Sequence, residues 1–412
     1  MPELTLRALR DDTDYQDFNT AMAWGFLEDP QPDDIRLARA FTDLDRMFGF
    51  HDGTRWVSTA GDYRKKVVLP GGVQTDVAAV TGVSVASDHR RRGLLSQMMR
   101  HQLDTIRDRG TEAVAMLFAS ETSIYGRFGY GLASQNATLS GPVRDLGFRP
   151  DVDLGGGSVS QIGVDTLLDV GPVIYDRAVA DLPGRMDRPR AWWDYQVFDN
   201  DERRKNSGSI RFALHRESDG TPSGFARYRT KSAWDASGPI GELHVEEVRA
   251  TNPRAYAKLW RFLLEIDLIR RLVFKDAAID EPLRGLVADS RALHCEVSDG
   301  IFVRLVDVRR ALTLRRYAAP VDAVLDVHDE FCPWNTARYR LRGDVDGAKC
   351  EKTDAPADIA IGVRDLGAVY LGGTTLAHLA AAGLVHEQTA GSVHRASVGF
   401  GWPVAPAIPD HY

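Results

Sequence analysis

The feature that most constrains this chain is an arginine-rich turn between a predicted strand and a predicted helix. The apolar run Asp76–Ala86 predicts a strand, and a helical pattern follows from about position 91 to position 109. Arg90–Arg92 and Gly93 stand at the joint. The first N–H groups of a helix lack partners within the helix, its dipole adds positive charge there, and glycine permits close approach of a ligand. The joint therefore predicts an anion site.

A solvated basic helix start is the alternative interpretation of the same residues. Arginine is electrostatically unfavourable at the positive end of a helix, which favours a bound anion over that alternative. The next apolar run, Ala113–Ala119, predicts another strand. A strand, a helix and a strand in this order favour parallel pairing, and hence a fold that mixes α and β elements.

Composition excludes several classes of protein. The 412 residues suggest two to four domains, and 43% hydrophobic residues suffice for several cores. A net charge of -7 provides no general basic surface for nucleic acid. Cys295, Cys332 and Cys350 fit neither a disulfide framework nor a metal-binding spacing. The acidic start and the lack of long apolar runs predict no membrane association, so we expect a cytoplasmic protein.

Proline and glycine mark the expected domain boundaries. The stretch from Arg149-Pro150 to Gly157 resembles a linker, and we place the first boundary at 150. A second strand-to-helix joint at Val248–Lys258 aligns with Val85–Leu95 but lacks the glycine and the three arginines. It indicates either a degenerate duplication or an unrelated joint. A small α+β domain is expected from 301, ending in the extended, proline-spaced tail Trp402–Pro409.

Two motifs together resemble a known family. Arg90, Gly93 and Leu95 resemble the coenzyme A pyrophosphate loop of the GCN5-related N-acetyltransferases, whose fingerprint is Arg/Gln-x-x-Gly-x-Gly/Ala. The leucine departs from that fingerprint. The loop HRRRGLL combined with the segment Ala119–Gly131 (ASETSIYGRFGYG) is similar to the enhanced intracellular survival (Eis) acetyltransferases of actinobacteria, which accept leucine there.

The resemblance implies an architecture for the whole chain. It implies an α/β fold of mixed α+β type, with an acetyltransferase domain at 1–150 that holds the acetyl-CoA site. A degenerate second acetyltransferase-like domain would follow at 151–300. A sterol-carrier-like domain at 301–412 would deliver the C-terminal carboxylate. The resemblance also implies acetyl-CoA as the acetyl donor, no metal, and a homohexamer.

The same resemblance assigns residues to roles. Tyr125 matches the family's general acid, and the family's base is the C-terminal carboxylate, here that of Tyr412. The family's terminus is often phenylalanine, but the reacting group belongs to the main chain. The residues expected to line the acetyl-CoA site are Val83, Ser84, Val85, Arg91, Arg92, Gly93, Leu94, Leu95, Ser96, Ser120 and Glu121.

The chemistry of acetyl transfer fits these roles. The ammonium must lose a proton and the departing thiolate must gain one. Tyrosine, with a pKa of ~10, can donate to a thiolate whose conjugate pKa is ~8.5. A carboxylate with a pKa of ~3.5 is a poor base, so burial must raise it or it relays the proton through water, which we favour. Without the resemblance, an aromatic anchor in a glycine-rich turn is a better explanation of Tyr125 than catalysis.

Acidic residues near the start suggest the acceptor. The first 34 residues contain nine carboxylates and two arginines. These are either solvated helix faces or the edge of a pocket for a polycationic amine, formed by Trp24, Phe26, Glu28 and Asp29. Asp410 either binds a cation or is a solvated tail acid.

The leading hypothesis is therefore an acetyl-CoA-dependent N-acetyltransferase for primary amines of an aminoglycoside, a polyamine or a protein lysine. The alternatives are a lipid or sterol carrier and a coenzyme A-binding regulatory protein without turnover.

Overall fold

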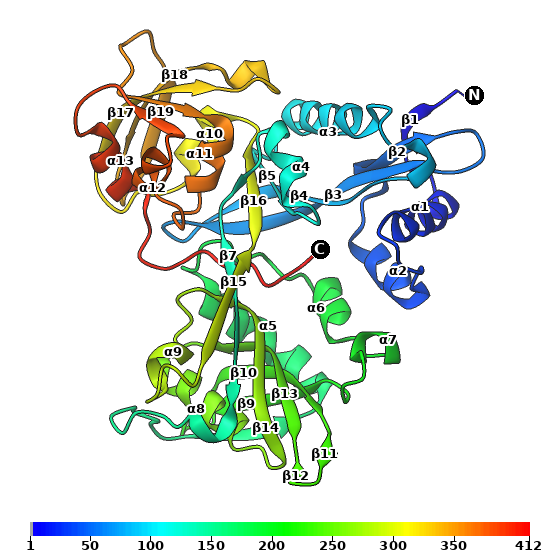
Figure 1. Cartoon of the computed structure of the whole chain (residues 1–412), viewed down its shortest axis with the longest axis vertical. Helices are drawn as coiled ribbons and strands as arrows, with labels where there is room; N and C mark the ends of the chain where they lie inside the picture. Colours follow the sequence, from blue (N-terminus) through cyan, green and yellow to red (C-terminus); the bar gives the residue numbers. More distant parts are fainter. Residues whose placement is uncertain (1–2) are drawn as a thin grey trace. The chain divides into compact units, whose positions relative to one another are not determined.

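The computed structural model describes residues 3–412 and divides the chain into two compact units (Figure 1). The first unit contains the chain up to Ser134, then Gly300–Pro406 and Asp410–Tyr412. The second contains Gln135–Asp299 and Ala407–Pro409. Each unit is built around its own seven-stranded mixed sheet, and the first carries an additional five-stranded sheet.

The large sheet of the first unit pairs its strands in the order β1-β2-β3-β4-β5-β16-β6. Only the β4–β5 pair is parallel, and the other pairs are antiparallel. The strands are β1 (Thr5–Ala8), β2 (Met47–His51), β3 (Ser58–Leu69), β4 (Val73–Val85), β5 (Val114–Phe118), β16 (Ile301–Leu305) and β6 (Gly131–Leu132). The helices are α1 (Asp12–Gly25), α2 (Pro32–Ala38), α3 (Leu94–Arg109) and α4 (Thr122–Tyr125).

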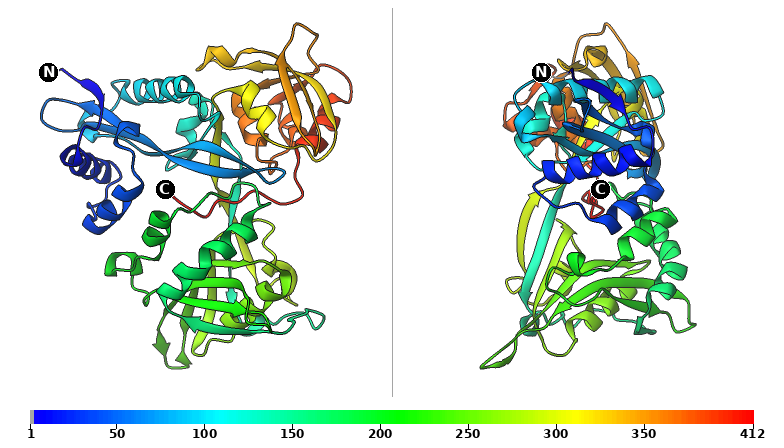
Figure 2. Two further views of the ribbon diagram at one scale, coloured as in Figure 1. Left: turned by 180° about the vertical axis from the view of Figure 1, so that it is seen from behind. Right: turned by 90° about the vertical axis from the view of Figure 1, so that its right-hand side faces the viewer.

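Helices α1 and α3 cover opposite faces of this sheet (Figure 1). Met47 packs in the cluster of Tyr15 and Phe18 from α1, whereas Phe48 packs in the cluster of Met98 from α3. Consecutive residues of a strand point to opposite faces of the sheet, so α1 and α3 lie on different faces. Figure 2 shows the same layers from two further sides.

The C-terminal part of the first unit has its own sheet, in the order β19-β18-β17-β20-β21. Arg315 is fully buried there and donates to the carbonyls of Tyr370 at 2.6 Å and Phe400 at 2.7 Å. The tail after position 400 therefore starts from a fixed point. The elements are α10 (Val308–Leu314), β17 (Val321–His328), β18 (Ala337–Gly343), β19 (Ala348–Lys352), β20 (Ile359–Gly362), α11 (Val363–Val369), α12 (Leu376–Ala381), β21 (Val385–Glu387) and α13 (Ser392–Phe400).

The second unit pairs its strands in the order β15-β7-β14-β13-β10-β9-β8, with β13 and β14 parallel. Its α8 follows β13 as α3 follows β4, so the aligned strand-to-helix joint exists as predicted. The elements are β7 (Gln135–Pro142), β8 (Ser158–Ile162), α5 (Val164–Val179), α6 (Arg190–Val197), α7 (Asp201–Arg204), β9 (Arg211–Arg216), β10 (Pro222–Lys231), β11 (Trp234–Asp235), β12 (Gly238–Pro239), β13 (Gly241–Ala250), α8 (Pro253–Leu264), β14 (Ile269–Ala278), α9 (Leu283–Leu286) and β15 (His294–Asp299).

The sheets divide the chain at other positions than the expected boundaries of 150 and 300. Strand β7 lies before 150 but pairs with β14 and β15 in the second sheet. Strand β16 lies after 300 but pairs with β5 and β6 in the first sheet. The linker-like glycines at 155–157 therefore precede β8 within the second unit. Local composition could not reveal this because strand partners are chosen by tertiary pairing.

No helix within residues 3–412 is long and apolar enough to span a membrane.

Candidate functional site

The arginine joint between β4 and α3 exposes its cationic side chains. Arg91 has a φ of 60° and Gly93 a φ of 77°, so the backbone turns sharply before α3 begins at Leu94. Arg90–Arg92 are exposed, and none of them forms an ion pair with a carboxylate of residues 3–412. No side chain caps the helix start. Uncapped N–H groups, the helix dipole and three exposed arginines without a carboxylate partner within residues 3–412 therefore occur at one helix start, as an anion site requires.

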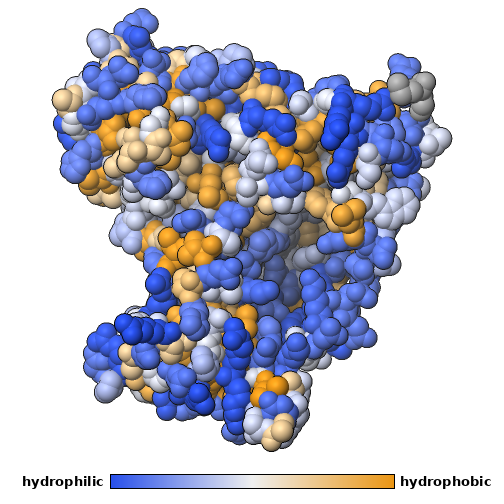
Figure 3. Space-filling model, viewed as in Figure 1, coloured by the Kyte–Doolittle hydropathy of each residue, from blue (hydrophilic) through white to orange (hydrophobic). Residues whose placement is uncertain are grey.

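The first residues of α3 differ in how deeply they are buried. Leu94 is buried in the core, Leu95 is half-buried, and Ser96 is exposed. Figure 3 shows that hydrophilic residues predominate on the visible surface over α3. A left-handed conformation suits glycine, so Gly93 is required by its φ and not by crowding, since a Cβ there would meet only Gln97 at 3.7 Å.

Strands β4 and β5 separate next to this joint. Their parallel pairing is confined to Ala78 with Ala115 and Ala79 with Met116. Beyond it, the register of β4 against β3 shifts at the bulge around Gly82. Within residues 3–412, the main-chain groups of Val83–Val85 that face β5 therefore have no partner strand, and an extended ligand can bind to them as an added strand would. The Ser84 hydroxyl points away, 2.7 Å from the Thr59 hydroxyl.

Tyr125 lies at the end of α4, which follows β5 through Ser120 and Glu121. Both of these residues are exposed, and Glu121 precedes the first residue of α4. The Tyr125 side chain is 6% exposed. Burial, with a smaller contribution from the charge of Glu121, raises the pKa of Tyr125 to about 12. The phenol therefore stays protonated at neutral pH and is a proton donor, not a base.

The end of the chain returns to the same end of β5. The rings of His411 and Tyr412 lie 4.2 Å and 5.4 Å from the ring of Phe118, the last residue of β5. Asp410 is 3% exposed. It is therefore buried, and the interpretation of Asp410 as a solvated acid of the tail is wrong. Residues 401–412 contain no helix or strand, as the proline spacing predicted. The structure thus brings the chain terminus to the strand that leads to Tyr125.

Extending the chain beyond Tyr412 is expected to lower kcat by about tenfold or more, because added residues displace the carboxylate that the site would use. Tyr412→Phe is the matched control. Its hydroxyl is buried without a partner in residues 3–412, so the substitution removes no hydrogen bond and keeps the carboxylate. Steady-state kinetics of the three proteins at equal thermal stability decide the matter. Full activity of the extended chain would show that the terminus has no role.

The predicted acceptor residues do not all come together. Trp24 is 60% exposed and helps to line a hollow of about 470 Å³ with Asp17, Arg55, Trp56 and Asp88. Phe26, Glu28 and Asp29 are exposed after the end of α1 and are not part of that lining. The ion pair between Arg55 and Asp88, at 2.5 Å, partly neutralises the hollow. Asp17, rather than Glu28, is the carboxylate that accompanies Trp24.

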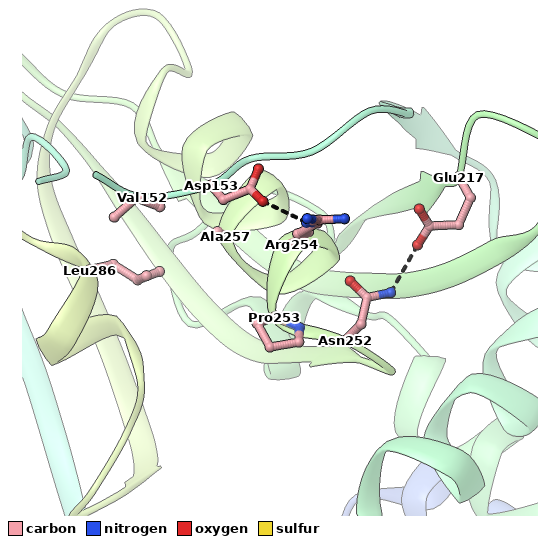
Figure 4. Close-up of a pocket in the computed structure, with 8 residues that line it drawn as sticks. All are labelled: Val152, Asp153, Glu217, Asn252, Pro253, Arg254, Ala257 and Leu286. Atoms are coloured by element: carbon pink, nitrogen blue, oxygen red, sulfur yellow. Dashed lines mark hydrogen bonds and ion pairs between the residues drawn. The ribbon is translucent and has the colours of Figure 1, made fainter. Parts of the chain in front are cut away.

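The joint in the second unit is occupied by the chain's own groups. Asn252 accepts from Ala255 N–H at 2.9 Å and so caps α8, and its amide donates to Glu217 at 2.9 Å (Figure 4). Arg254 forms an ion pair with Asp153 at 2.7 Å. These residues line a hollow of about 550 Å³ whose other walls include Val152 and Leu286 (Figure 4). A capped helix start with a paired arginine is a weaker anion site than the joint of the first unit.

Sequence reasoning missed three contributors to the first site. Phe118 receives the chain terminus, Tyr130 lies edge-on to Tyr125 with ring centroids 6.0 Å apart, and Gly82 forms the bulge. An isolated glycine inside a strand pattern is a signal for a bulge and could have revealed Gly82. The other two contacts depend on tertiary structure.

No group of three or more His, Cys, Asp or Glu side chains that could hold a metal ion occurs within residues 3–412.

Family models match three successive parts of the chain. Residues 5–133 and residues 184–305 each match a model described as an acetyltransferase (GNAT) domain. Residues 308–409 match a model described as a sterol carrier protein domain. The second match supports a degenerate duplication over two unrelated joints.

Whole-chain relatives agree with these models. A Streptomyces avermitilis protein named "uncharacterized N-acetyltransferase" is 42% identical over 376 residues, which cover 90% of this chain and 91% of that protein. N-acetyltransferase Eis of Mycobacterium tuberculosis is 34% identical over 326 residues, 77% of this chain and 76% of Eis. The crystal structure of Eis1 from Mycobacterium abscessus matches with a TM-score of 0.85 at 30% identity, covering 99% of this chain and 100% of that chain.

Proposed function

The chain belongs to the Eis group of GCN5-related N-acetyltransferases, and we propose that it transfers acetyl groups from acetyl-CoA to primary amines of polycationic acceptors. Such acceptors include aminoglycosides, polyamines and lysine side chains of proteins. The observation that supports the proposal is that the ring of Tyr412 lies against Phe118, the last residue of β5, the strand that leads into α4 and Tyr125. The arginine joint and the unpaired edge of β4 lie in the same domain.

The residues present fit acetyl-CoA. Its pyrophosphate needs hydrogen-bond donors and positive charge, which the N–H groups from Arg91 to Ser96 and the exposed guanidinium groups of Arg91 and Arg92 supply. Its amide-bearing arm needs an open strand edge, which Val83–Val85 supply. Ser120 and Glu121 are exposed at the end of the neighbouring strand β5. When bound, acetyl-CoA supplies an acetyl group already activated as a thioester.

Tyr125 is the proton donor in this proposal. With a pKa of about 12, its phenol is fully protonated at neutral pH, so every molecule can offer a hydrogen bond to the departing sulfur. Complete proton transfer to a thiolate with a conjugate pKa of ~8.5 is uphill for such a weak acid. Tyr125 therefore acts first by a hydrogen bond that strengthens as negative charge develops on the sulfur.

The carboxylate of Tyr412 acts on the acceptor. An anionic group at the end of β5 attracts an ammonium group and accepts its proton through water as the new bond forms. The aromatic contacts of His411 and Tyr412 with Phe118 limit the motion of the terminus, which reduces the entropy lost when the acceptor is positioned.

Acidic side chains on α1 and in the following loop select the acceptor. Asp17, Glu28 and Asp29 all belong to this first part of the chain and are exposed. Their combined field favours acceptors with several ammonium groups. Trp24 adds an exposed indole face on which a cation can lie.

Raising the salt concentration from about 0.05 M to about 0.5 M is expected to increase KM several-fold for a polyamine and much less for a monoamine of similar size, because screening weakens long-range attraction. The double variant Glu28→Gln, Asp29→Asn removes two of the acidic side chains. It should reduce the difference in the salt dependence of KM between the two amines. Equal salt dependence of the two amines would exclude selection by acidic residues.

The family membership also supports a homohexameric assembly and a cytoplasmic location, which we include in the proposal. We do not include lipid carriage. The interior of the sterol-carrier-like part is occupied by the fully buried side chains of Arg315, Tyr317, Tyr339 and Tyr370, which bind to backbone carbonyls.

Mass spectrometry of products tests the acceptor class. The protein is incubated with acetyl-CoA and an equimolar mixture of a polyamine, an aminoglycoside, a lysine peptide and a monoamine. Acetylation of at least one polycationic member before the monoamine is expected. Preferential acetylation of the monoamine would contradict the proposed class while leaving the acetyltransferase activity intact.

A further inference from the structure

Buried polar atoms without hydrogen-bond partners lie beside Tyr125. Tyr130 and Arg304 are fully buried, yet Tyr130 Oη and the Nε and Nη1 atoms of Arg304 have no partner within residues 3–412. Buried polar atoms are almost always hydrogen-bonded to protein or to ordered water. Tyr130 Oη therefore requires a partner that is not a side chain, whereas the Arg304 guanidinium also interacts with the Cys332 thiol.

Several contacts place these atoms together. The rings of Tyr125 and Tyr130 are edge-on. The Arg304 guanidinium lies against Gly129, where a Cβ would come within 2.8 Å of Nη1 and 2.9 Å of Nε. Burial raises the pKa of Tyr130 and the charge of Arg304 opposes this. Burial, with a smaller contribution from Tyr130, also raises the pKa of the Tyr412 phenol. Tyr130 thus lies beside the ring of the proton donor, next in sequence to the glycine that contacts the buried arginine, and near the phenol of Tyr412.

One edge of Arg304 is already fixed. Its Nη2 donates to both carboxylate oxygens of Asp329, at 2.9 Å and 2.7 Å. Asp329 also accepts from Cys332 N–H and from the Asn335 amide, both at 2.9 Å. These contacts fix the guanidinium, whose flat face lies on Gly129, the neighbour of Tyr130, while its Nε and Nη1 stay without a hydrogen-bond partner within residues 3–412. The arginine is therefore positioned as a rigid donor.

We propose that Tyr130 and Arg304 hold an internal water that connects the Tyr125 hydroxyl with Tyr412 and returns a proton to Tyr125 in each catalytic cycle. The inference rests on the proposed function, since it takes Tyr125 as the proton donor. Water suits the site because it can accept from Arg304 and donate onward at the same time.

The proton balance closes without a further reactant. Tyr125 Oη gives its proton to the sulfur as the bond between carbon and sulfur breaks, in the same step in which the water returns a proton to Oη, so that no free tyrosinate has to form. The amine nitrogen loses a proton as the bond between carbon and nitrogen forms, and the Tyr412 carboxylate accepts it. The water passes a proton to Tyr125 Oη and receives one from the carboxylate. Tyr130 stays a neutral phenol and Arg304 stays a cation, so both are positioning residues.

The variant Tyr130→Phe tests the relay. It removes one oxygen that has no protein partner, so the thermal midpoint and the Kd for acetyl-CoA should not change. We expect kcat to fall by about tenfold with KM nearly constant, and the solvent isotope effect on kcat to change. A crystal structure of the wild type should show a water within hydrogen-bond distance of Tyr130 Oη and Arg304, which is displaced in the variant.

Tyr370→Phe is the matched control. Its hydroxyl donates to Ala311 O at 2.9 Å in the sterol-carrier-like part, so the variant should be less stable but keep its kcat. Wild-type kcat in Tyr130→Phe, together with no ordered water at the site, would overturn the relay. If Tyr130→Phe does not fold, a proton inventory of the wild type replaces it, and a linear inventory would overturn the relay.

Tyr125→Phe measured in parallel separates the two proposals. If it is inactive while Tyr130→Phe is normal, only the relay fails. If Tyr125→Phe is fully active, the assignment of Tyr125 as proton donor fails first.

Discussion

Replacing Gly93 with proline is expected to abolish detectable binding of acetyl-CoA. Proline fixes φ near about −65°, whereas Gly93 has a φ of 77°, so the turn before α3 cannot keep its shape. The substitution also removes one main-chain donor at the point where the pyrophosphate would lie. Isothermal titration calorimetry on the folded variant measures the loss. Unchanged affinity would remove this joint from the site.

Gly110→Pro provides the matched control for strain. Gly110 ends the same helix with a φ of 68°, and its N–H donates to Ile106 O at 3.3 Å. Proline there imposes a comparable backbone conflict at the far end of α3, away from the joint. We expect a lower thermal midpoint with acetyl-CoA affinity largely retained. The pair therefore distinguishes a loss of the binding loop from a general weakening of the helix.

Tyr125→Phe is expected to lower kcat by roughly 10² or more while acetyl-CoA affinity stays nearly constant, because only the hydroxyl is lost. The Tyr125 hydroxyl has no hydrogen bond to other residues of the described chain, and the ring remains packed against Tyr130. Stability should therefore change little. Presteady-state kinetics with saturating acetyl-CoA and amine measure the chemical step.

Tyr228→Phe is a suitable control for that experiment. Burial raises the pKa of Tyr228 too, but it lies on β10 in the second unit. Its loss should leave kcat unchanged. A reduction of less than about threefold in Tyr125→Phe would return Tyr125 to the role of an aromatic anchor in the turn.

The arginine joint shows what local sequence can predict. The strand, the turn and the helix at 76–109 have local causes, namely alternating apolar residues, a glycine with positive φ and an apolar helix face. The observed helix begins at Leu94, three residues after the predicted start at 91. The reason is that Arg91 and Gly93 both adopt left-handed conformations. The helix at the second joint, α8, ends at Leu264, and β14 begins at Ile269.

Contacts between distant segments could not be predicted in this way. The exchange of β7 and β16 between sheets depends on which strands pair, and no local pattern records it. The contact of Tyr412 with Phe118 joins the last residue to the end of β5. Family resemblance predicted the role of the terminus, whereas the residues alone suggested only an extended tail.

Release of free coenzyme A thiol from acetyl-CoA, with and without a polyamine, tests the central claim most directly. The wild type, Tyr125→Phe and a form extended beyond Tyr412 are compared after calorimetry has shown that all three bind acetyl-CoA equally. The account predicts rapid thiol release that depends on the amine in the wild type and is strongly reduced in both variants. Equal thiol release by all three proteins, or release that does not depend on the amine, would contradict it.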